Sequence, residues 1–65
     1  MKKEQWYDRL KQKRLEINKT QADIGSMIGV SERTIIRYEQ GEVEEPLPII
    51  RLAIEKIIGG IFLWN

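Results

Sequence analysis

The segment from Gln21 to Gly41 constrains the fold of this 65-residue chain more than any other. Its apolar residues recur at helical spacings in two sets, one before and one after Gly29. A residue with a short polar side chain precedes each set, as is typical of a helix N-cap. Gly29 stands where the first helix must end and the chain must turn, a place that favours a positive φ. The segment therefore predicts two short helices, 21–28 and 32–40, joined by a tight turn. The first apolar set is Ala22, Ile24 and Ile28 with Val30 in the turn, the second is Ile35 and Tyr38 with Ile36 beside them, and the two caps are Thr20 and Ser31.

An earlier segment, Lys3 to Ile17, has the spacing of a third helix. Trp6, Leu10 and Ile17 fall along one apolar stripe, and Arg14 lies on the same line. An unpaired buried charge is costly, so an arginine on an apolar stripe needs a partner.

The last predicted helix runs from Pro48 to Ile58. Proline suits the first turn of a helix, and Gly59-Gly60 ends the apolar pattern. Pro46 keeps the preceding loop, residues 42–47, out of helix. The chain is thus expected to be all-α, with four to five short helices, and residues 1–58 are expected to form one domain. The apolar face of this last helix is broader than one packing partner needs, since Ile49, Leu52 and Ala53 widen the stripe of Ile50, Ile54, Ile57 and Ile58.

The run TQADIGSMIGVSERTIIRYEQG resembles the helix-turn-helix of the phage repressor and Cro family, the Xre-like regulators. The resemblance extends from about Leu10 to Ile57, and it departs from the family at Gly25, where alanine is usual. It implies a lambda-repressor-like fold and a transcriptional regulator that binds specific double-stranded DNA. The positions that carry the resemblance are Gln21, Gly25, Gly29, Val30, Ser31, Ile35, Tyr38, Glu39 and Gly41.

The same resemblance implies a structural ion pair between Arg14 and Glu39. In the family, the arginine at this place pairs with the glutamate that ends the recognition helix. The alternative is an exposed Arg14 on a solvated flank.

The second helix of such a motif enters the major groove with its N-terminal residues leading. If Ile35 and Tyr38 face inward, the opposite face presents the candidate base-reading residues. Arginine can bond the O6 and N7 atoms of guanine, and a glutamate can accept from cytosine N4 or simply favour the helix N-terminus. Arginines four residues apart share one helical face. The candidate base readers are Glu32, Arg33, Thr34 and Arg37.

Phosphate contacts are expected around the start of the first helix of the motif, where backbone N–H groups are free. Gln21 is similar to the phosphate-contacting glutamine of the family. The full set of candidate phosphate-binding residues is Lys19, Thr20, Gln21, Ser31, Gln40 and Gly41.

Composition narrows the function classes. The chain has no Cys and no His, which removes thiolate and imidazole metal ligands and the commonest general base. We therefore expect no metal, no cofactor, no small-molecule substrate and no enzymatic activity. Neither a signal peptide nor a membrane span is expected, so a cytoplasmic protein is the default.

The net charge of +1 is unevenly distributed. Residues 1–41 contain nine Lys/Arg and six acidic residues (+3), whereas residues 42–65 contain two and four (−2). The basic part contains the helix-turn-helix, as phosphate binding requires. The alternative function is a protein-interaction module of the antitoxin or anti-repressor type, for which Arg33 and Arg37 would be unexpected.

The C-terminal segment 59–65 contains four consecutive apolar residues, an unfavourable feature in water. We expect this segment to contribute the contact of a homodimer, which would let two copies read two half-sites. The alternative is that it folds back over the core of its own chain. The expected contact residues are Ile61, Phe62, Leu63 and Trp64.

Overall fold

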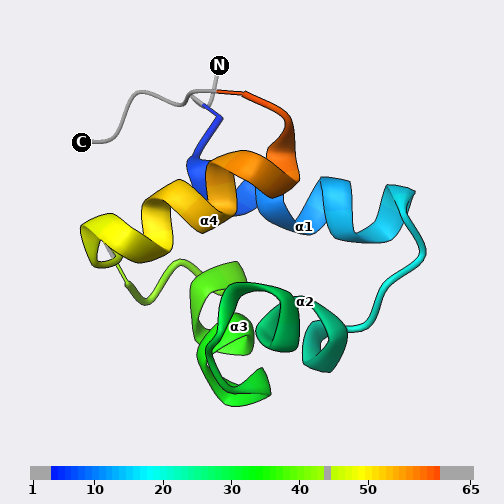
Figure 1. Cartoon of the computed structure of the whole chain (residues 1–65), viewed down its shortest axis with the longest axis horizontal. Helices are drawn as coiled ribbons and strands as arrows, with labels where there is room; N and C mark the ends of the chain where they lie inside the picture. Colours follow the sequence, from blue (N-terminus) through cyan, green and yellow to red (C-terminus); the bar gives the residue numbers. More distant parts are fainter. Residues whose placement is uncertain (1–3, 44, 61–65) are drawn as a thin grey trace.

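The computed structural model describes residues 4–43 and 45–60, and these residues form four helices. In Figure 1, α1 and α4 lie across one half of the molecule, and α2 and α3 across the other. α2 packs mainly against α3, and α1 contacts both α4 and α3. The expected all-α arrangement is confirmed. The helices are α1 (Trp6–Glu16), α2 (Gln21–Ile28), α3 (Glu32–Glu39) and α4 (Pro48–Ile58).

The bounds of α2 and α4 agree with the sequence-based expectation, whereas those of α1 and α3 differ. α1 begins at Trp6 because Gln5 is extended, and the Gln5 N–H donates to the Asp8 carboxylate at 3.1 Å. The start expected at Lys3 lies outside the described residues. α1 ends at Glu16 rather than Ile17, because Asn18 takes the left-handed conformation with φ of 58°. α3 ends at Glu39, and Gln40 is its C-cap.

Thr20 and Asp23 hold the start of α2 through a reciprocal capping box. The Asp23 N–H donates to Thr20 Oγ1 at 3.0 Å, and the Thr20 N–H donates to Asp23 Oδ2 at 3.0 Å. The hydrogen bond from the Thr20 N–H first, and the Thr20 hydroxyl second, hold the pKa of the Asp23 carboxyl below its usual range. An aspartate therefore completes a cap that usually contains Glu or Gln.

Two glycines shape the turn between α2 and α3. Gly29 has φ of 94°, the left-handed conformation that glycine adopts without strain. Gly25 is required by proximity, because a Cβ there would lie 2.7 Å from the Val30 carbonyl oxygen and 3.2 Å from Ser31 C. Both neighbours are backbone atoms, so an alanine at residue 25 fits only if the turn shifts. Glycine is less favourable than alanine inside a helix by about 1 kcal/mol. At residue 25 this cost is the consequence of the close approach of the turn to α2.

The core contains residues from all four helices. The rings of Trp6 and Tyr38 meet edge to face with centroids 5.2 Å apart, which joins α1 to α3. Two residues expected inside are outside. Ile17 is 36% exposed because it is the C-cap of α1, where the chain leaves the apolar stripe. Ala22 is exposed because it lies two residues from Ile24, on the other side of α2. The buried core residues are Trp6, Leu10, Ile24, Ile28, Ile35, Tyr38, Ile54 and Ile58.

The outer face of α4 leaves apolar side chains uncovered. Ile49 is 72% exposed and Leu52 is 62% exposed. They line an apolar groove with Ile17 of the α1 end and Met27 of α2. This agrees with an apolar face broader than the core of one chain requires.

Tyr38 makes the stability of the fold sensitive to alkaline pH. Burial raises the pKa of its hydroxyl above the ordinary value of 10.0. The stability that neutral Tyr38 supplies is therefore fully present below about pH 10 and is lost as pH rises through the higher pKa of the folded state. We expect the Tyr38→Phe variant to lose less stability than the wild type over this range. Denaturant unfolding from about pH 8 to about pH 11 measures the difference, and parallel curves for the two proteins would contradict it.

Candidate nucleic-acid interface

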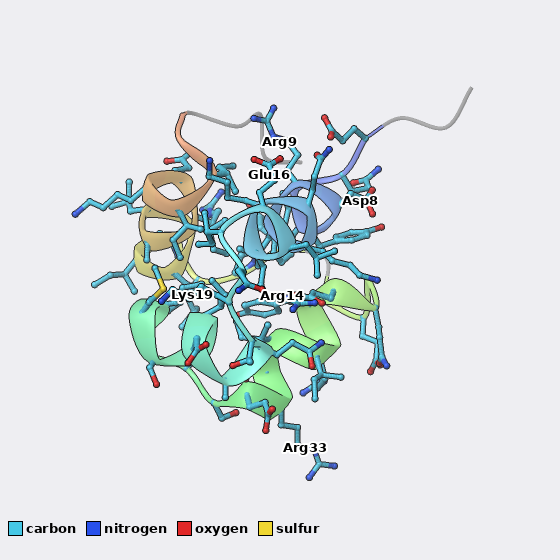
Figure 2. The ribbon with its side chains drawn as sticks, turned by 90° about the vertical axis from the view of Figure 1, so that its right-hand side faces the viewer. Asp8, Arg9, Arg14, Glu16, Lys19 and Arg33 are labelled. Atoms are coloured by element: carbon cyan, nitrogen blue, oxygen red, sulfur yellow. The ribbon has the colours of Figure 1, made fainter. Side chains whose placement is uncertain are left out.

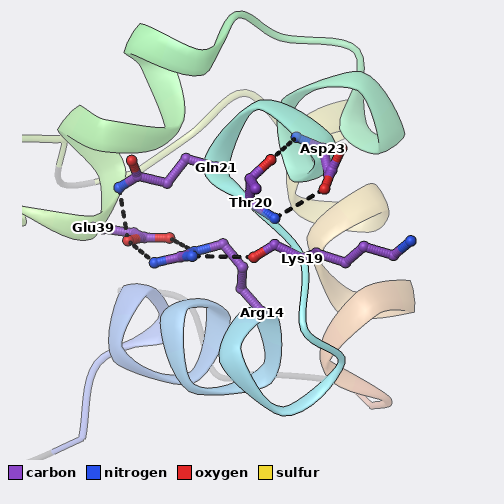
Figure 3. Close-up of polar contacts among 6 residues, drawn as sticks. All are labelled: Arg14, Lys19, Thr20, Gln21, Asp23 and Glu39. Atoms are coloured by element: carbon purple, nitrogen blue, oxygen red, sulfur yellow. Dashed lines mark hydrogen bonds and ion pairs between the residues drawn. The ribbon is translucent and has the colours of Figure 1, made fainter.

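A bidentate ion pair joins α1 to the end of α3. Arg14 Nε donates to Glu39 Oε2 at 2.7 Å, and Arg14 Nη2 donates to Glu39 Oε1 at 3.1 Å. The side chains are only 12% and 4% exposed, so the pair lies inside the molecule. Figure 3 shows the guanidinium group lying alongside the carboxylate between the helices. The ion pair implied by the sequence resemblance is thus present, and Arg14 does not lie on a solvated flank.

The pair also reaches the start of α2. Gln21 Nε2 donates to Glu39 Oε1 at 3.1 Å, and Arg14 Nη1 donates to the Lys19 carbonyl at 3.1 Å (Figure 3). One carboxylate therefore fixes the Gln21 side chain, while its arginine partner fixes the backbone before α2. Sequence reasoning missed the contact between Gln21 and Glu39, because no local pattern relates residues 18 positions apart.

The outer face of α3 presents charged side chains to solvent. Glu32, Arg33 and Arg37 are exposed, and Figure 2 shows Arg33 extending away from the body of the protein. Arg37 Nε lies 3.7 Å from Glu42 Oε1, and both side chains are more than half exposed. Exposed pairs of this kind are worth about 0–1 kcal/mol, so Arg37 can exchange Glu42 for another acceptor at little cost.

Thr34 differs from the other candidate base readers. It is half-buried, and its N–H donates to Ser31 Oγ at 3.2 Å. Its hydroxyl oxygen also lies 3.0 Å from Ser31 Oγ, within hydrogen-bond distance. The structure thus places Thr34 and Ser31 together at the N-terminus of α3, where both serve the cap.

The candidate phosphate-binding residues before α2 lie close together. Lys19 and Thr20 are exposed, Gln21 is half-buried, and the Lys19 amino group points away from Arg14 in Figure 3. A helix start leaves its first N–H groups without partners inside the helix. Thr20 Oγ1 accepts from the Asp23 N–H. The N–H groups of Gln21 and Ala22 are left for an external acceptor.

Gln40 and Gly41 follow α3, and the structure separates their roles. The Gly41 N–H donates to the Tyr38 carbonyl at 2.9 Å, so the single donor of Gly41 is already used. Its φ of 75° and its closeness to the Tyr7 ring make it a turn residue. The Gly41 N–H is thus already engaged within the chain, whereas Gln40 keeps an exposed side chain. The phosphate contact expected at Gly41 stays a prediction.

Ile36 is a residue of this face that sequence reasoning placed with the inward apolar set. It is half-buried, but it is not among the apolar residues that pack against the core. It lines a hollow on the outer side of α3 together with Arg33, Arg37, Gln40 and Glu42. The available signal was its position one residue off the stripe formed by Ile35 and Tyr38.

Residues 4–43 and 45–60 contain no cluster of three or more carboxylates, histidines or cysteines that could hold a metal ion. No helix described by the structure is both long and apolar enough to cross a membrane.

Comparison with known proteins identifies the family. The sequence profile of the helix-turn-helix family matches residues 10–59. The chain belongs to the helix-turn-helix family. This span contains all of α2, α3 and α4 and most of α1, and the resemblance to the phage repressor and Cro regulators is confirmed.

A solved structure has the same fold. The chain is similar to the P22 c2 repressor protein, whose crystal structure contains the synthetic operator 9T in the presence of Tl⁺. The two are 29% identical, with a TM-score of 0.80, and the match covers 91% of this chain and 88% of the repressor chain. No curated protein matches the sequence. The lambda-repressor-like fold expected from the sequence is confirmed.

The buried ion pair generates a stability prediction. We expect Glu39→Ala to destabilise the protein by roughly 3–5 kcal/mol, because Arg14 would remain buried without its partner. That is about the stability a core of this size supplies, so the variant should be largely unfolded at room temperature. Circular dichroism against temperature and denaturant measures the loss.

The matched control is Glu45→Ala, which removes the exposed partner of Arg51 at 2.8 Å. Exposed pairs contribute about 0–1 kcal/mol, so this variant should unfold close to the wild type. Similar unfolding midpoints for the Glu39 and Glu45 variants would show that the Arg14 pair does not stabilise the fold.

Proposed function

We propose that this protein is a transcriptional regulator that binds specific double-stranded DNA with α3 in the major groove. The observation that carries the proposal is the pair of exposed arginines on the outer face of α3, Arg33 and Arg37. Their helix belongs to a fold that matches a repressor crystallised with its operator. The proposal concerns residues 1–58 as one DNA-binding domain.

Base reading is assigned to the outer face of α3. An α-helix fits the major groove, where each base pair shows a distinct pattern of donors and acceptors. Arg33 and Arg37 are one turn apart and can each bond a guanine through O6 and N7. Glu32 can accept from cytosine N4 and repels phosphate elsewhere. Thr34 lies at the edge of this surface, with its hydroxyl beside Ser31.

Phosphate contacts are assigned to both ends of the helix pair. Gln21 and the open N–H groups at the start of α2 can hold one phosphate oxygen, with Lys19 and Thr20 beside them. Ser31 and Gln40, the caps of α3, are assigned to further phosphate contacts. The hydrogen bond from Gln21 to Glu39 supports this role, because a side chain held in place loses less entropy on binding. These contacts position the protein, whereas the base contacts select the sequence.

We also propose that the protein acts as a homodimer, so that two copies of α3 reach half-sites about 34 Å apart. The exposed apolar side chains of Ile49 and Leu52 on α4 support a second apolar interface. The segment 59–65 is proposed to join that interface through Ile61, Phe62, Leu63 and Trp64. These four residues lie outside the described residues, so the support for their role comes from their composition.

Selection from a random duplex pool tests the DNA-binding proposal. We expect one sequence motif to be enriched, and we expect the logarithm of its binding constant to fall linearly with the logarithm of salt concentration. Recovery of an unenriched pool, with binding unaffected by salt, would reject specific DNA binding.

Variants of the two assigned contact types should behave differently on the enriched duplex. Arg37→Ala should cost about 1–3 kcal/mol on that duplex and relax base preference at one position. Gln21→Ala should weaken binding to all duplexes alike, because phosphates carry no sequence information. Fluorescence anisotropy on the enriched duplex and on single-base changes measures both effects.

Lys11→Ala is the charge-matched control, because it removes one exposed positive charge from α1, outside the helix pair of α2 and α3. It should change affinity little. If Arg37→Ala behaved like Lys11→Ala in both affinity and base preference, the assigned reading face would be wrong.

Deletion of residues 60–65 tests the dimer contact. We expect the truncated protein to remain folded, to become monomeric and to bind DNA more weakly, because the second half-site contact is lost. Light scattering gives the mass, and circular dichroism gives the fold. A truncated protein that is still dimeric would reject this segment as the dimer contact, and a wild-type monomer would favour the fold-back alternative.

A further inference from the structure

Ile36 is an apolar residue among charged and polar side chains on the outer face of α3. It is half-buried without packing against the core, and it lines a hollow with Arg33, Arg37, Gln40 and Glu42. It follows Arg33 by three residues and precedes Gln40 by four, so these side chains share one flank of the helix. The core therefore does not account for an isoleucine at this position.

The position of Ile36 matters because of what the major groove contains. Base edges there offer hydrogen-bond donors and acceptors, and the C5-methyl group of thymine is the apolar group among them. A branched aliphatic side chain that displaces water from a hydrogen-bond donor or acceptor of a base leaves that group unpaired, which costs free energy. Contact with a methyl group is favourable instead, because it removes apolar surface from water. The hollow around Ile36 is bounded by the two arginines assigned to guanine.

We infer that Ile36 is a specificity-determining residue that reads the methyl group of a thymine next to a guanine contacted by Arg33 or Arg37. This inference rests on the proposed function, since it places α3 in the major groove. It adds an apolar element to a reading surface otherwise made of charged and polar side chains. The operator half-site should therefore contain a thymine within one or two base pairs of a required guanine.

Replacement of thymine by deoxyuridine tests the inference, because uracil pairs as thymine does but lacks the C5-methyl group. Each thymine of the enriched duplex is replaced in turn, and affinity is measured by anisotropy. We expect one thymine per half-site at which the wild-type protein binds about fourfold more weakly after replacement, the effect of exposing roughly one methyl group. Ile36→Ala should bind the thymine and uracil duplexes equally at that position.

Leu15→Ala provides the matched control, because it also truncates a branched aliphatic side chain, at a position of α1 that is 60% exposed. It should keep the wild-type preference for thymine. The thermal midpoint of Ile36→Ala should stay near that of the wild type, since Ile36 does not belong to the core cluster. The uracil scan with the wild-type protein measures the methyl preference even if a variant does not fold.

Three results would overturn the inference: an enriched motif without thymine near a required guanine, a wild type indifferent to uracil at every position, or a methyl preference that persists in Ile36→Ala. An enriched motif with arginine-dependent guanines but no methyl preference would reject only the role of Ile36. The absence of any enriched motif would reject the proposed function as well.

Discussion

The fold and the candidate interface both depend on the carboxylate of Glu39. Desolvation of a buried ion pair is costly, and the cost is offset only when good geometry and further hydrogen bonds satisfy the remaining groups. Here one carboxylate oxygen accepts from Arg14 Nε, and the other accepts from Arg14 Nη2 and Gln21 Nε2. The remaining guanidinium nitrogen donates to the Lys19 carbonyl. The pair thus joins α1, the start of α2 and the end of α3 at a single point.

This arrangement separates residues that the fold requires from residues that are free to set specificity. Arg14, Glu39 and Gln21 connect the interface to the interior, so changes there affect fold and binding together. Arg33 and Arg37 are exposed, and their replacement leaves the core intact. Helix-turn-helix proteins can therefore change their target sequence through the outer face of the second helix without a new core.

The sequence predicted the structure best where a local chemical signal marks it. Thr20 and Ser31 are the N-caps of α2 and α3, and Pro48 is the first residue of α4, as expected from capping preferences. Predictions that depended on the tertiary path were weaker. Ile17 continued the α1 stripe in the sequence, yet the left-handed Asn18 turns the chain before it can pack. The close approach at Gly25 also depends on how the following turn folds back onto α2.

For the candidate interface too, local patterns predicted the structure well and tertiary contacts were missed. The helical period identifies the outward face of α3, and the family resemblance paired Arg14 with Glu39. Neither indicates that Gln21 shares the Glu39 carboxylate, that Arg37 lies beside Glu42, or that Ile36 stands outside the core. These contacts join residues that no periodic pattern relates, so only the three-dimensional arrangement reveals them.

We propose that the start of α2 and the outer face of α3 form one DNA-binding surface. Titration of the ¹⁵N-labelled protein with the enriched duplex, followed by amide chemical shifts, tests it most directly. We expect the largest shifts at the start of α2 and along α3, with the amides at the centre of α1 nearly unchanged. Shifts concentrated in α1, with α3 unaffected by the duplex, would contradict it.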